Sequence, residues 1–247
     1  MHSDETVDAV AGGKVQVIQK EKGFRFSLDA LLIAHFTALH LREKERLLEL
    51  GSGTGVISLL LARSRLNLEV IGLEIQGELV EMARRSVLLN HLEKRMEIKE
   101  GDVRKIKTLF SPSSFDVVVT NPPYRRIRSG RINPLAQKAM ARHEIAGSVG
   151  EFLQAASFVL KPKGRIYVIY TARRTAELIA SLRNARLEPK KMRIVYPYRE
   201  ASANFVLLEG IKEGGEELEI LPPLFIYERT NTYTQEMEGI FRDLSSL

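Results

Sequence analysis

From about residue 46 onward, short apolar runs alternate with longer segments in which apolar residues recur at i, i+3, i+4 and i+7, as in a helix. The apolar runs predict seven strands, at residues 46–50, 68–75, 95–102, 115–120, 164–170, 191–198 and 204–212. The helical segments between them cover residues 56–65, 77–92, 150–160 and 172–187. Repeated strand–helix units predict an α/β fold: a mostly parallel sheet with helices on both faces, in which the last two strands pair antiparallel.

Two segments flank this core. Residues 23–39, GFRFSLDALLIAHFTAL, read as an aromatic turn that leads into a helix, and LPPLFIYE begins a C-terminal extension. We therefore expect an N-terminal extension (1–45), a core (46–210) and an acidic C-terminal extension packed on the core (211–247).

Composition narrows the chemistry. The 247 residues include 44% apolar side chains and no cysteine, which excludes disulfides, thiolate metal sites and a cysteine nucleophile. No apolar run reaches the roughly 18 residues that span a bilayer, and the N-terminus lacks the pattern of a signal peptide. We expect a cytoplasmic protein without membrane association, and we propose no metal site, because the histidines lack metal-ligand spacing.

Charge is unevenly distributed along the chain. The net charge is +6, yet residues 211–247 carry eight acidic and three basic side chains. Residues 125–142 instead carry six basic residues and no acidic one: Arg125, Arg126, Arg128, Arg131, Lys138 and Arg142. Such segregation is typical of a nucleic-acid surface, although a solvated basic face has the same pattern.

A glycine-rich loop follows the first strand, in LELGSGTG. Gly51, Gly53 and Gly55 permit positive φ and let a ligand approach the backbone. A dinucleotide fingerprint needs a glycine where Val56 stands, and a P-loop needs a terminal Gly-Lys-Ser/Thr that is absent. The spacing, with Glu49 before it, instead resembles the first motif of S-adenosylmethionine-dependent methyltransferases.

Two carboxylates extend this interpretation. Glu74, followed by Ile75, closes the second strand, where it can accept hydrogen bonds from ribose hydroxyls. Asp102 closes the third, where it can accept from an adenine amine while the Val103 N–H donates to the ring. Either acid alone also suits a helix N-cap, but a glycine loop and two acids at three successive strand ends indicate a nucleoside-type cofactor.

The fourth strand ends in Asn121-Pro122-Pro123-Tyr124. Two prolines cannot continue a central strand, and they fix the Asn121 amide and the Pro122 carbonyl in space. Two acceptors that grip an –NH2 group favour a pyramidal nitrogen whose lone pair faces a methyl donor, and Tyr124 can stack on a flat ring. Alignment of this kind supplies roughly 7–11 kcal/mol of a barrier.

These motifs resemble those of amino-group methyltransferases, and most closely the bacterial tRNA valine adenine-N6 methyltransferases. GFRFSLDALLIAHF at 23–36, NPPYRRIRSGRINPLAQKAMARHE at 121–144 and the terminal PPLFIYE carry the likeness. It implies a Rossmann-like class I fold, S-adenosylmethionine as cofactor and an RNA substrate, methylated at adenine N6 in a tRNA anticodon loop. It also implies that the segment from Phe24 through Ser27 to Asp29 covers the cofactor, and that the loop with Arg125, Arg126, Arg128 and Arg131 reaches the RNA.

Other functions use the same motifs. Protein glutamine N5 methylation and ribosomal RNA guanine N2 methylation present an –NH2 group to a similar clamp. A non-catalytic RNA-binding module that retains the fold belongs to a different class. The basic segment favours nucleic acid over protein, and the sequence defines no oligomeric state.

Overall fold

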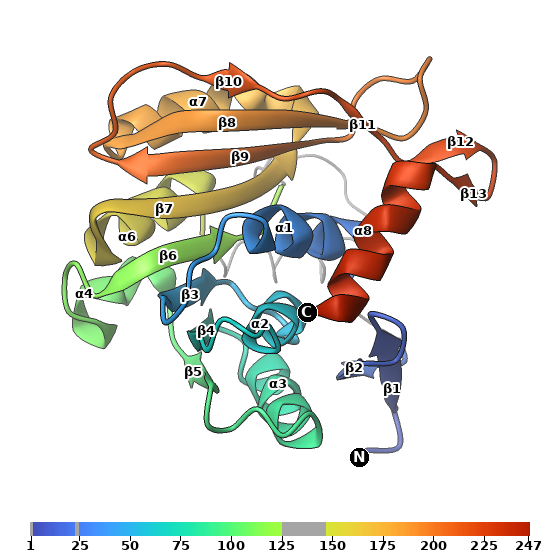
Figure 1. Ribbon diagram of the computed structural model, residues 1–247. Coiled ribbons are helices and arrows are strands. Elements are labelled where there is room, and N and C mark those ends of the chain that lie inside the picture. The colour runs from blue at the N-terminus through green and yellow to red at the C-terminus, as the bar shows by residue number, and fades with distance from the viewer. Residues whose placement is uncertain (1, 23–24, 125–146) are drawn as a thin grey trace, which may run out of the picture.

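The computed structural model describes residues 2–22, 25–124 and 147–247. Its centre is a twisted sheet in the order β10-β8-β9-β7-β6-β3-β4-β5 (Figure 1). Five strands are parallel: β3 (Arg46–Leu50), β4 (Glu69–Glu74), β5 (Met96–Glu100), β6 (Phe115–Thr120) and β7 (Leu160–Thr171). β9 (Phe205–Lys212) runs antiparallel to β7 and to β8 (Leu187–Tyr196). The predicted Rossmann-like, mostly parallel architecture with an antiparallel final strand is confirmed.

The predicted number of strands is wrong, because the described residues form a sheet of nine strands rather than seven. The two additional strands, β10 (Glu219–Ile220) and β11 (Leu224–Phe225), both pair parallel with β8. Each is two residues long, so neither leaves an alternating pattern in the sequence. They cover the edge of β8, which limits pairing with another chain.

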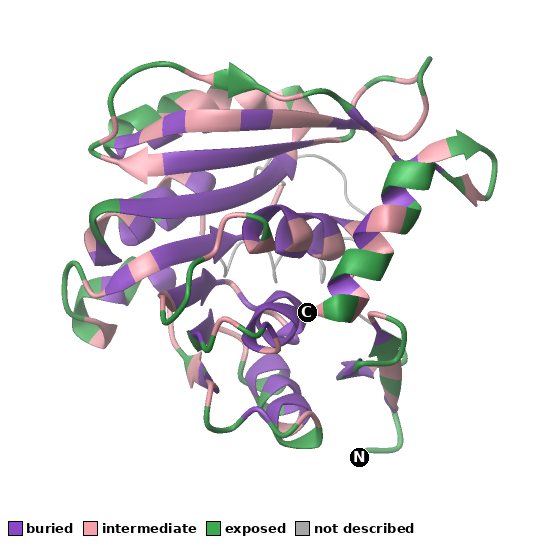
Figure 2. Cartoon of the chain, in the orientation of Figure 1, coloured by how far each residue is buried: buried purple, intermediate pink, exposed green. Residues whose placement is uncertain are grey.

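Helices cover both faces of the sheet (Figure 2). One face packs against α1 (Leu28–Ala38), α2 (Val56–Ala62), α3 (Gly77–Leu89) and α8 (Gln235–Ser246). The other packs against the 3-10 turn η1 (Val103–Lys105), α4 (Ile106–Leu109), α6 (Val149–Val159) and α7 (Thr175–Asn184), with a second 3-10 turn, η2 (Ala172–Arg174), leading into α7. Neighbours along a strand alternate between the two cores: Val117 and Val119 belong to the first and Val118 to the second. This alternation explains the continuous apolar runs in the sequence.

Two small hairpins lie outside the sheet. β1 (Glu5–Val10) and β2 (Val15–Lys20) form an antiparallel pair that packs against α3, and β12 (Tyr227–Arg229) pairs with β13 (Thr232–Tyr233) before α8. The sequence patterns predicted neither hairpin. Among the described residues, no helix is both long and apolar enough to cross a bilayer.

The direction of winding reverses between β3 and β6. From β3 the chain proceeds to β4 and β5 on one side, and then returns to place β6 on the other. The carboxyl ends of β3 and β6 therefore lie side by side: Leu50 pairs with Thr120, and the Thr120 hydroxyl donates to the Leu50 carbonyl at 2.8 Å. Ligands of open α/β sheets bind at such a switch point, and both the glycine loop and Asn121 begin there.

Candidate functional site

The glycine loop connects β3 to α2 at the carboxyl edge of the sheet. Gly51, Gly53 and Gly55 have φ of +73°, +55° and +82°, a region that side-chain-bearing residues rarely adopt. A Cβ at Gly51 would lie 3.0 Å from Cε1 of Phe152. The loop thus depends on glycine both for its backbone conformation and for its close approach to α6.

Glu74 faces this loop from the end of β4. Its carboxylate accepts hydrogen bonds from the Gly53 N–H and the Gln76 N–H, both at 2.9 Å. The side chain is buried, so two backbone donors fix its orientation while further lone pairs remain for a ligand hydroxyl.

A pocket opens beside Glu74. It is lined by Gly51, Leu73, Glu74, Ile75, Gly101, Val103 and Phe152. Its side chains are apolar except for the Glu74 carboxylate, a composition typical of small-molecule sites. The structure thereby brings together Gly51, Glu74, Ile75 and Val103, four of the residues that the sequence predicted for cofactor binding.

Asp102 lies next to this pocket, at the N-cap of η1. Its side chain accepts from the Arg104 N–H at 2.9 Å and from the Arg104 guanidinium at 2.6 and 2.9 Å. The guanidinium lowers the pKa of Asp102 below its ordinary value. A ligand amine that used this carboxylate would share it with Arg104.

Glu49 is buried beneath the loop rather than exposed at the pocket. It accepts from the Ser58 N–H at 2.9 Å and from the Ser58 hydroxyl. Burial raises the pKa of Glu49 to about 8. In this position Glu49 ties the first turn of α2 to β3, and its predicted contact with a cofactor stays a prediction.

The Asn-Pro-Pro-Tyr segment forms a corner at the end of β6. Nδ2 of Asn121 donates to Oδ2 of Asp29 at 3.0 Å, and the Tyr124 hydroxyl lies 3.0 Å from the same oxygen and against Oδ1 of Asn121. The Tyr124 ring meets Tyr170 edge to face, with centroids 5.6 Å apart. Burial raises the pKa of Tyr124 well above its ordinary value, which keeps the phenol protonated. Pro122 is buried and Pro123 half-buried, so the backbone of the corner is rigid.

Comparison with known proteins identifies the family. Residues 41–220 match the family model described as "Methyltransferase domain". The chain belongs to this methyltransferase family. The predicted relationship is confirmed, and S-adenosylmethionine is the methyl donor that this enzyme class implies.

Several curated relatives of this methyltransferase have the same name, tRNA1(Val) (adenine(37)-N6)-methyltransferase. The protein from Porphyromonas gingivalis (strain ATCC BAA-308 / W83) is 33% identical over 133 residues, 53% of this chain and 51% of the relative. That from Tolumonas auensis is 24% identical over 227 residues, 88% of each chain. The chain thus matches about half the length of the first of these relatives.

Solved structures share the methyltransferase fold. A predicted O-methyltransferase from Agrobacterium tumefaciens has a TM-score of 0.72 at 22% identity, covering 88% of this chain and 97% of that one. TYW2 of P. horikoshii in complex with MeSAdo has a TM-score of 0.62 at 16% identity, covering 86% and 73%. At these identities the likeness concerns the fold alone.

Sequence reasoning missed the part that two residues play in the candidate site. Phe152 has the pattern of an ordinary core position of a predicted helix, yet it lines the same pocket as Glu74. Asp29 ends the segment that the sequence resemblance predicts to cover the cofactor, and its contacts with both Asn121 and Tyr124 were not predicted. Ser27 donates to Asp29 and precedes α1. The predicted positions Phe24, Arg125, Arg126, Arg128 and Arg131 lie outside the described residues.

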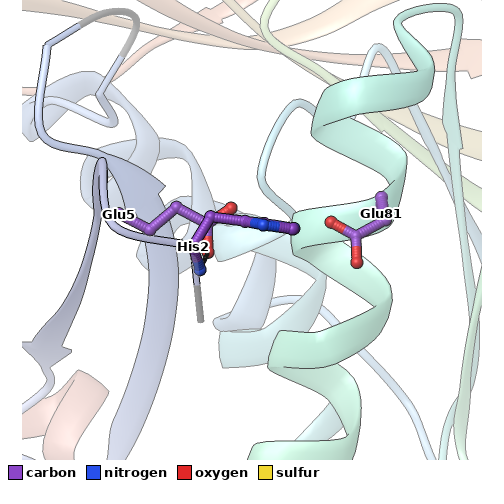
Figure 3. A group of neighbouring side chains, drawn as sticks. All are labelled: His2, Glu5 and Glu81. Carbon is purple, nitrogen blue, oxygen red and sulfur yellow. Dashed lines mark hydrogen bonds between the residues drawn. The ribbon is translucent and has the colours of Figure 1, made fainter.

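One group of side chains in the methyltransferase has the composition of a metal site. His2, Glu5 and Glu81 bring one potential ligand atom each within 4.8 Å of the others (Figure 3). The Arg85 guanidinium already binds both carboxylates, at 2.7 and 2.8 Å for Glu5 and 2.7 Å for Glu81. A cation there would displace or oppose Arg85, so we interpret this group as an ion-pair network.

Proposed function

We propose that this chain transfers a methyl group from S-adenosylmethionine to the exocyclic N6 of an adenine in RNA, with a tRNA anticodon loop as substrate. The observation that carries this proposal is the juxtaposition of the glycine loop after β3 and the Asn121 corner after β6, on paired strands at the switch point. A donor held by the loop and an amine held by the corner would then lie next to each other.

The lining of the described pocket supports this choice of donor. The loop lets a ligand approach its backbone, Glu74 keeps lone pairs for the ribose hydroxyls, and Ile75, Val103 and Phe152 supply apolar walls for a purine. When bound, the donor supplies an electrophilic methyl group on a sulfonium. Oriented hydrogen bonds to charged groups are worth roughly 1.5–3 kcal/mol each, enough for Glu74 to set the orientation of the nucleoside.

The protein's part in the reaction is alignment. Oδ1 of Asn121 and the Pro122 carbonyl accept the two N–H bonds of the acceptor amine, which turns the nitrogen lone pair away from the ring. The rigid Pro122-Pro123 backbone holds both acceptors in place, so little entropy is lost when the amine binds. The predicted stacking of Tyr124 on the base belongs to the same proposal.

RNA is proposed over protein as the substrate for two reasons. The relatives that carry the tRNA methyltransferase name extend over as much as 88% of this chain. The segment with Arg125, Arg126, Arg128 and Arg131 follows the corner directly in the sequence, and the exposed Arg173 lies in the turn η2 after β7, at the same edge of the sheet. The proposal also includes a cytoplasmic location. It further divides the chain into an N-terminal extension (1–45), a core (46–210) and a C-terminal extension (211–247).

Labelled-methyl transfer to total RNA and to total protein, followed by nucleoside and amino-acid analysis, tests it. We expect N6-methyladenosine in the tRNA fraction, and Asn121→Ala should abolish that product while its affinity for S-adenosylmethionine changes only a few-fold. N5-methylglutamine or N2-methylguanosine as the product would replace the proposed acceptor. Full activity of Asn121→Ala would remove the role of the corner, and no binding heat with S-adenosylmethionine would favour a non-catalytic RNA-binding module.

A further inference from the structure

Asp29 lies in the first turn of α1, 92 residues before Asn121, yet its carboxylate contacts the Asn121–Tyr124 segment at the end of β6. We call this segment the acceptor corner. It is buried, with 7% of its surface exposed. Oδ1 accepts from the Ala30 N–H at 2.9 Å and from the Ser27 hydroxyl, and Oδ2 faces Asn121 and Tyr124 at 3.0 Å each. Both oxygens of this carboxylate are therefore engaged by protein donors.

The contact determines which end of the Asn121 amide faces the acceptor. A carboxylate only accepts hydrogen bonds, so the amide must turn its nitrogen toward Asp29. Oδ1 is then directed away from Asp29, where it can accept from an amine. Without Asp29, the amide could present its NH2 group to the substrate amine. Two hydrogen-bond donors facing each other form no hydrogen bond, so the amine would not be held.

The Tyr124 hydroxyl gives the contact a second consequence. It has one proton but lies against two acceptors, Oδ1 of Asn121 and Oδ2 of Asp29. When an amine donates to Oδ1 of Asn121, the hydroxyl can give its proton to Asp29 instead. Asp29 thus lets Tyr124 release the amide oxygen without leaving a buried hydroxyl unsatisfied.

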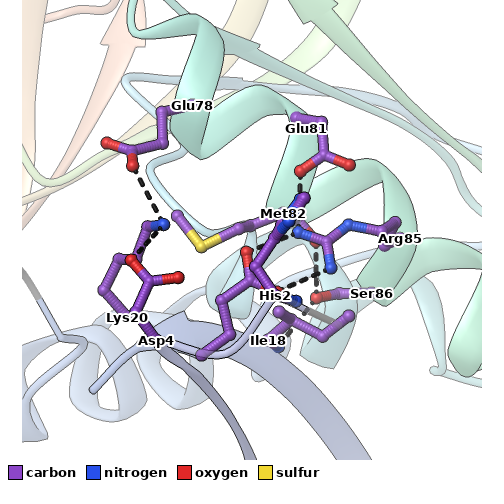
Figure 4. A network of polar contacts seen from close by, with 10 residues as sticks. His2, Asp4, Ile18, Lys20, Glu78, Glu81, Met82, Arg85 and Ser86 are labelled. Carbon is purple, nitrogen blue, oxygen red and sulfur yellow. Dashed lines mark hydrogen bonds and ion pairs between the residues drawn. The ribbon is translucent and has the colours of Figure 1, made fainter.

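The N-terminal hairpin holds the segment that carries Asp29. The Phe26 N–H donates to Oε1 of the buried Gln19 in β2 at 2.8 Å, and Arg25 binds Asp8 in β1. The hairpin is in turn fixed to α3 through Lys20 with Glu78 and the Ile18 N–H with the Ser86 hydroxyl (Figure 4), and through Arg85 with Glu5. The path from α3 to the acceptor corner is continuous.

We propose that Asp29 is a positioning residue for methyl transfer, which orients the Asn121 amide so that its oxygen faces the acceptor amine. This inference rests on the proposed function and adds a residue that acts through Asn121 rather than on the substrate.

The test compares Asp29→Leu with Asp29→Asn. Leucine keeps the branched outline of the side chain, although it is larger, and it accepts no hydrogen bond, so kcat should fall roughly 10- to 100-fold while KM for RNA and the affinity for S-adenosylmethionine change little. Asparagine retains an oxygen for Asn121 at the cost of the Ala30 hydrogen bond, so it should recover activity to roughly tenfold or less below the parent enzyme. Asp116→Leu is the matched control: Asp116 is a carboxylate of strand β6, which Asn121 follows, and it accepts from the Arg46 N–H at 3.0 Å. Its replacement should leave kcat unchanged.

A readout independent of activity separates this inference from the proposed function. In nitrogen-labelled protein, the side-chain NH2 signal of Asn121, assigned by its absence in Asn121→Ala, should shift and exchange faster with solvent in Asp29→Leu. An unmoved signal, an undiminished kcat in Asp29→Leu, or an Asp29→Asn variant as inactive as Asp29→Leu would each overturn the proposal. If the parent enzyme methylates no adenine, the proposed function fails, and the NH2 signal still decides the role of Asp29.

Discussion

Replacing Glu5 by glutamine should loosen the N-terminal hairpin from α3. Glu5 is polar at a buried position of β1, with 1% of its side chain exposed. It accepts from the Arg85 guanidinium at 2.7 and 2.8 Å and from the His2 N–H at 2.9 Å. Arg85 also binds Glu81 (Figure 4). Glutamine is nearly isosteric but uncharged, so the substitution removes the charge and one acceptor and leaves the volume intact.

The size of the effect follows from the pKa of Glu5. The hydrogen bonds from Arg85 lower this pKa to about 2 from an ordinary value of 4.5. A shift of this size corresponds to at most roughly 3 kcal/mol of stability, at 1.36 kcal/mol per unit. Because the folded pKa is lower than the unfolded one, the contribution is complete above about pH 4.5 and is lost as the pH falls toward 2.

Urea denaturation at pH 7 and pH 3, with amide hydrogen exchange of β1 and β2, measures this effect. We expect Glu5→Gln to lower the free energy required to open the hairpin by roughly 2–3 kcal/mol relative to the parent at pH 7. The difference between variant and parent should be smaller at pH 3. Glu81→Gln is the matched control, since that carboxylate binds the same guanidinium from an exposed position and should matter by less than about 1 kcal/mol. A cost below about 1 kcal/mol for Glu5→Gln, or an equal cost at both pH values, would refute the reasoning.

Three further predictions concern the site. The raised pKa of Glu49, about 8, means that the unfolded chain loses this proton before the folded one, so stability falls as the pH rises from about 4.5 to 8. Glu49→Gln should therefore gain roughly 2 kcal/mol relative to the parent between pH 5 and pH 7 in urea denaturation, and parallel curves would contradict this. Glu74→Gln should raise the Kd for S-adenosylmethionine roughly tenfold in calorimetry, because a charged acceptor becomes neutral; an unchanged Kd would place the ribose elsewhere. Arg173→Ala should reduce the salt dependence of RNA binding, lowering the slope of log K against log salt by about 0.7 for each phosphate that the variant no longer neutralises; an unchanged slope would place the RNA on another surface.

Periodicity predicted the order of strands and helices well, since each central strand is buried on both faces and bounded by turns. Periodicity failed where polar residues occupy buried positions, and where an element is too short to show a repeating pattern. Glu5 and Gln19 are polar residues in buried positions of the hairpin, so ETVDAV and VQVIQK did not read as strands. β10 and β11 have only two residues each.

Some residues of the candidate site could likewise be predicted from the sequence, and others could not. Gly51, Glu74 and Val103 follow strand ends, and parallel strands bring their carboxyl ends to one edge, so sequence order alone placed them together. Asp29 and Phe152 come from helices whose placement depends on tertiary packing. No local spacing relates Asp29 to Asn121 across 92 residues, and an aspartate in a first helical turn is ordinary.

The acceptor corner shows why its motif indicates the chemistry but not the substrate. Asp29 fixes the amide of Asn121, and the Arg174 guanidinium donates to the Tyr124 carbonyl at 2.7 Å, so both ends of the segment are held from outside. In the proposed function, such a corner takes an –NH2 group next to a methyl donor, whether that group belongs to adenine, guanine or glutamine. Discrimination among them must come from surfaces around the corner that contact the rest of the substrate. Arg173, exposed in the turn η2 that follows β7, is the described residue on which the salt-dependence prediction above tests such a contact.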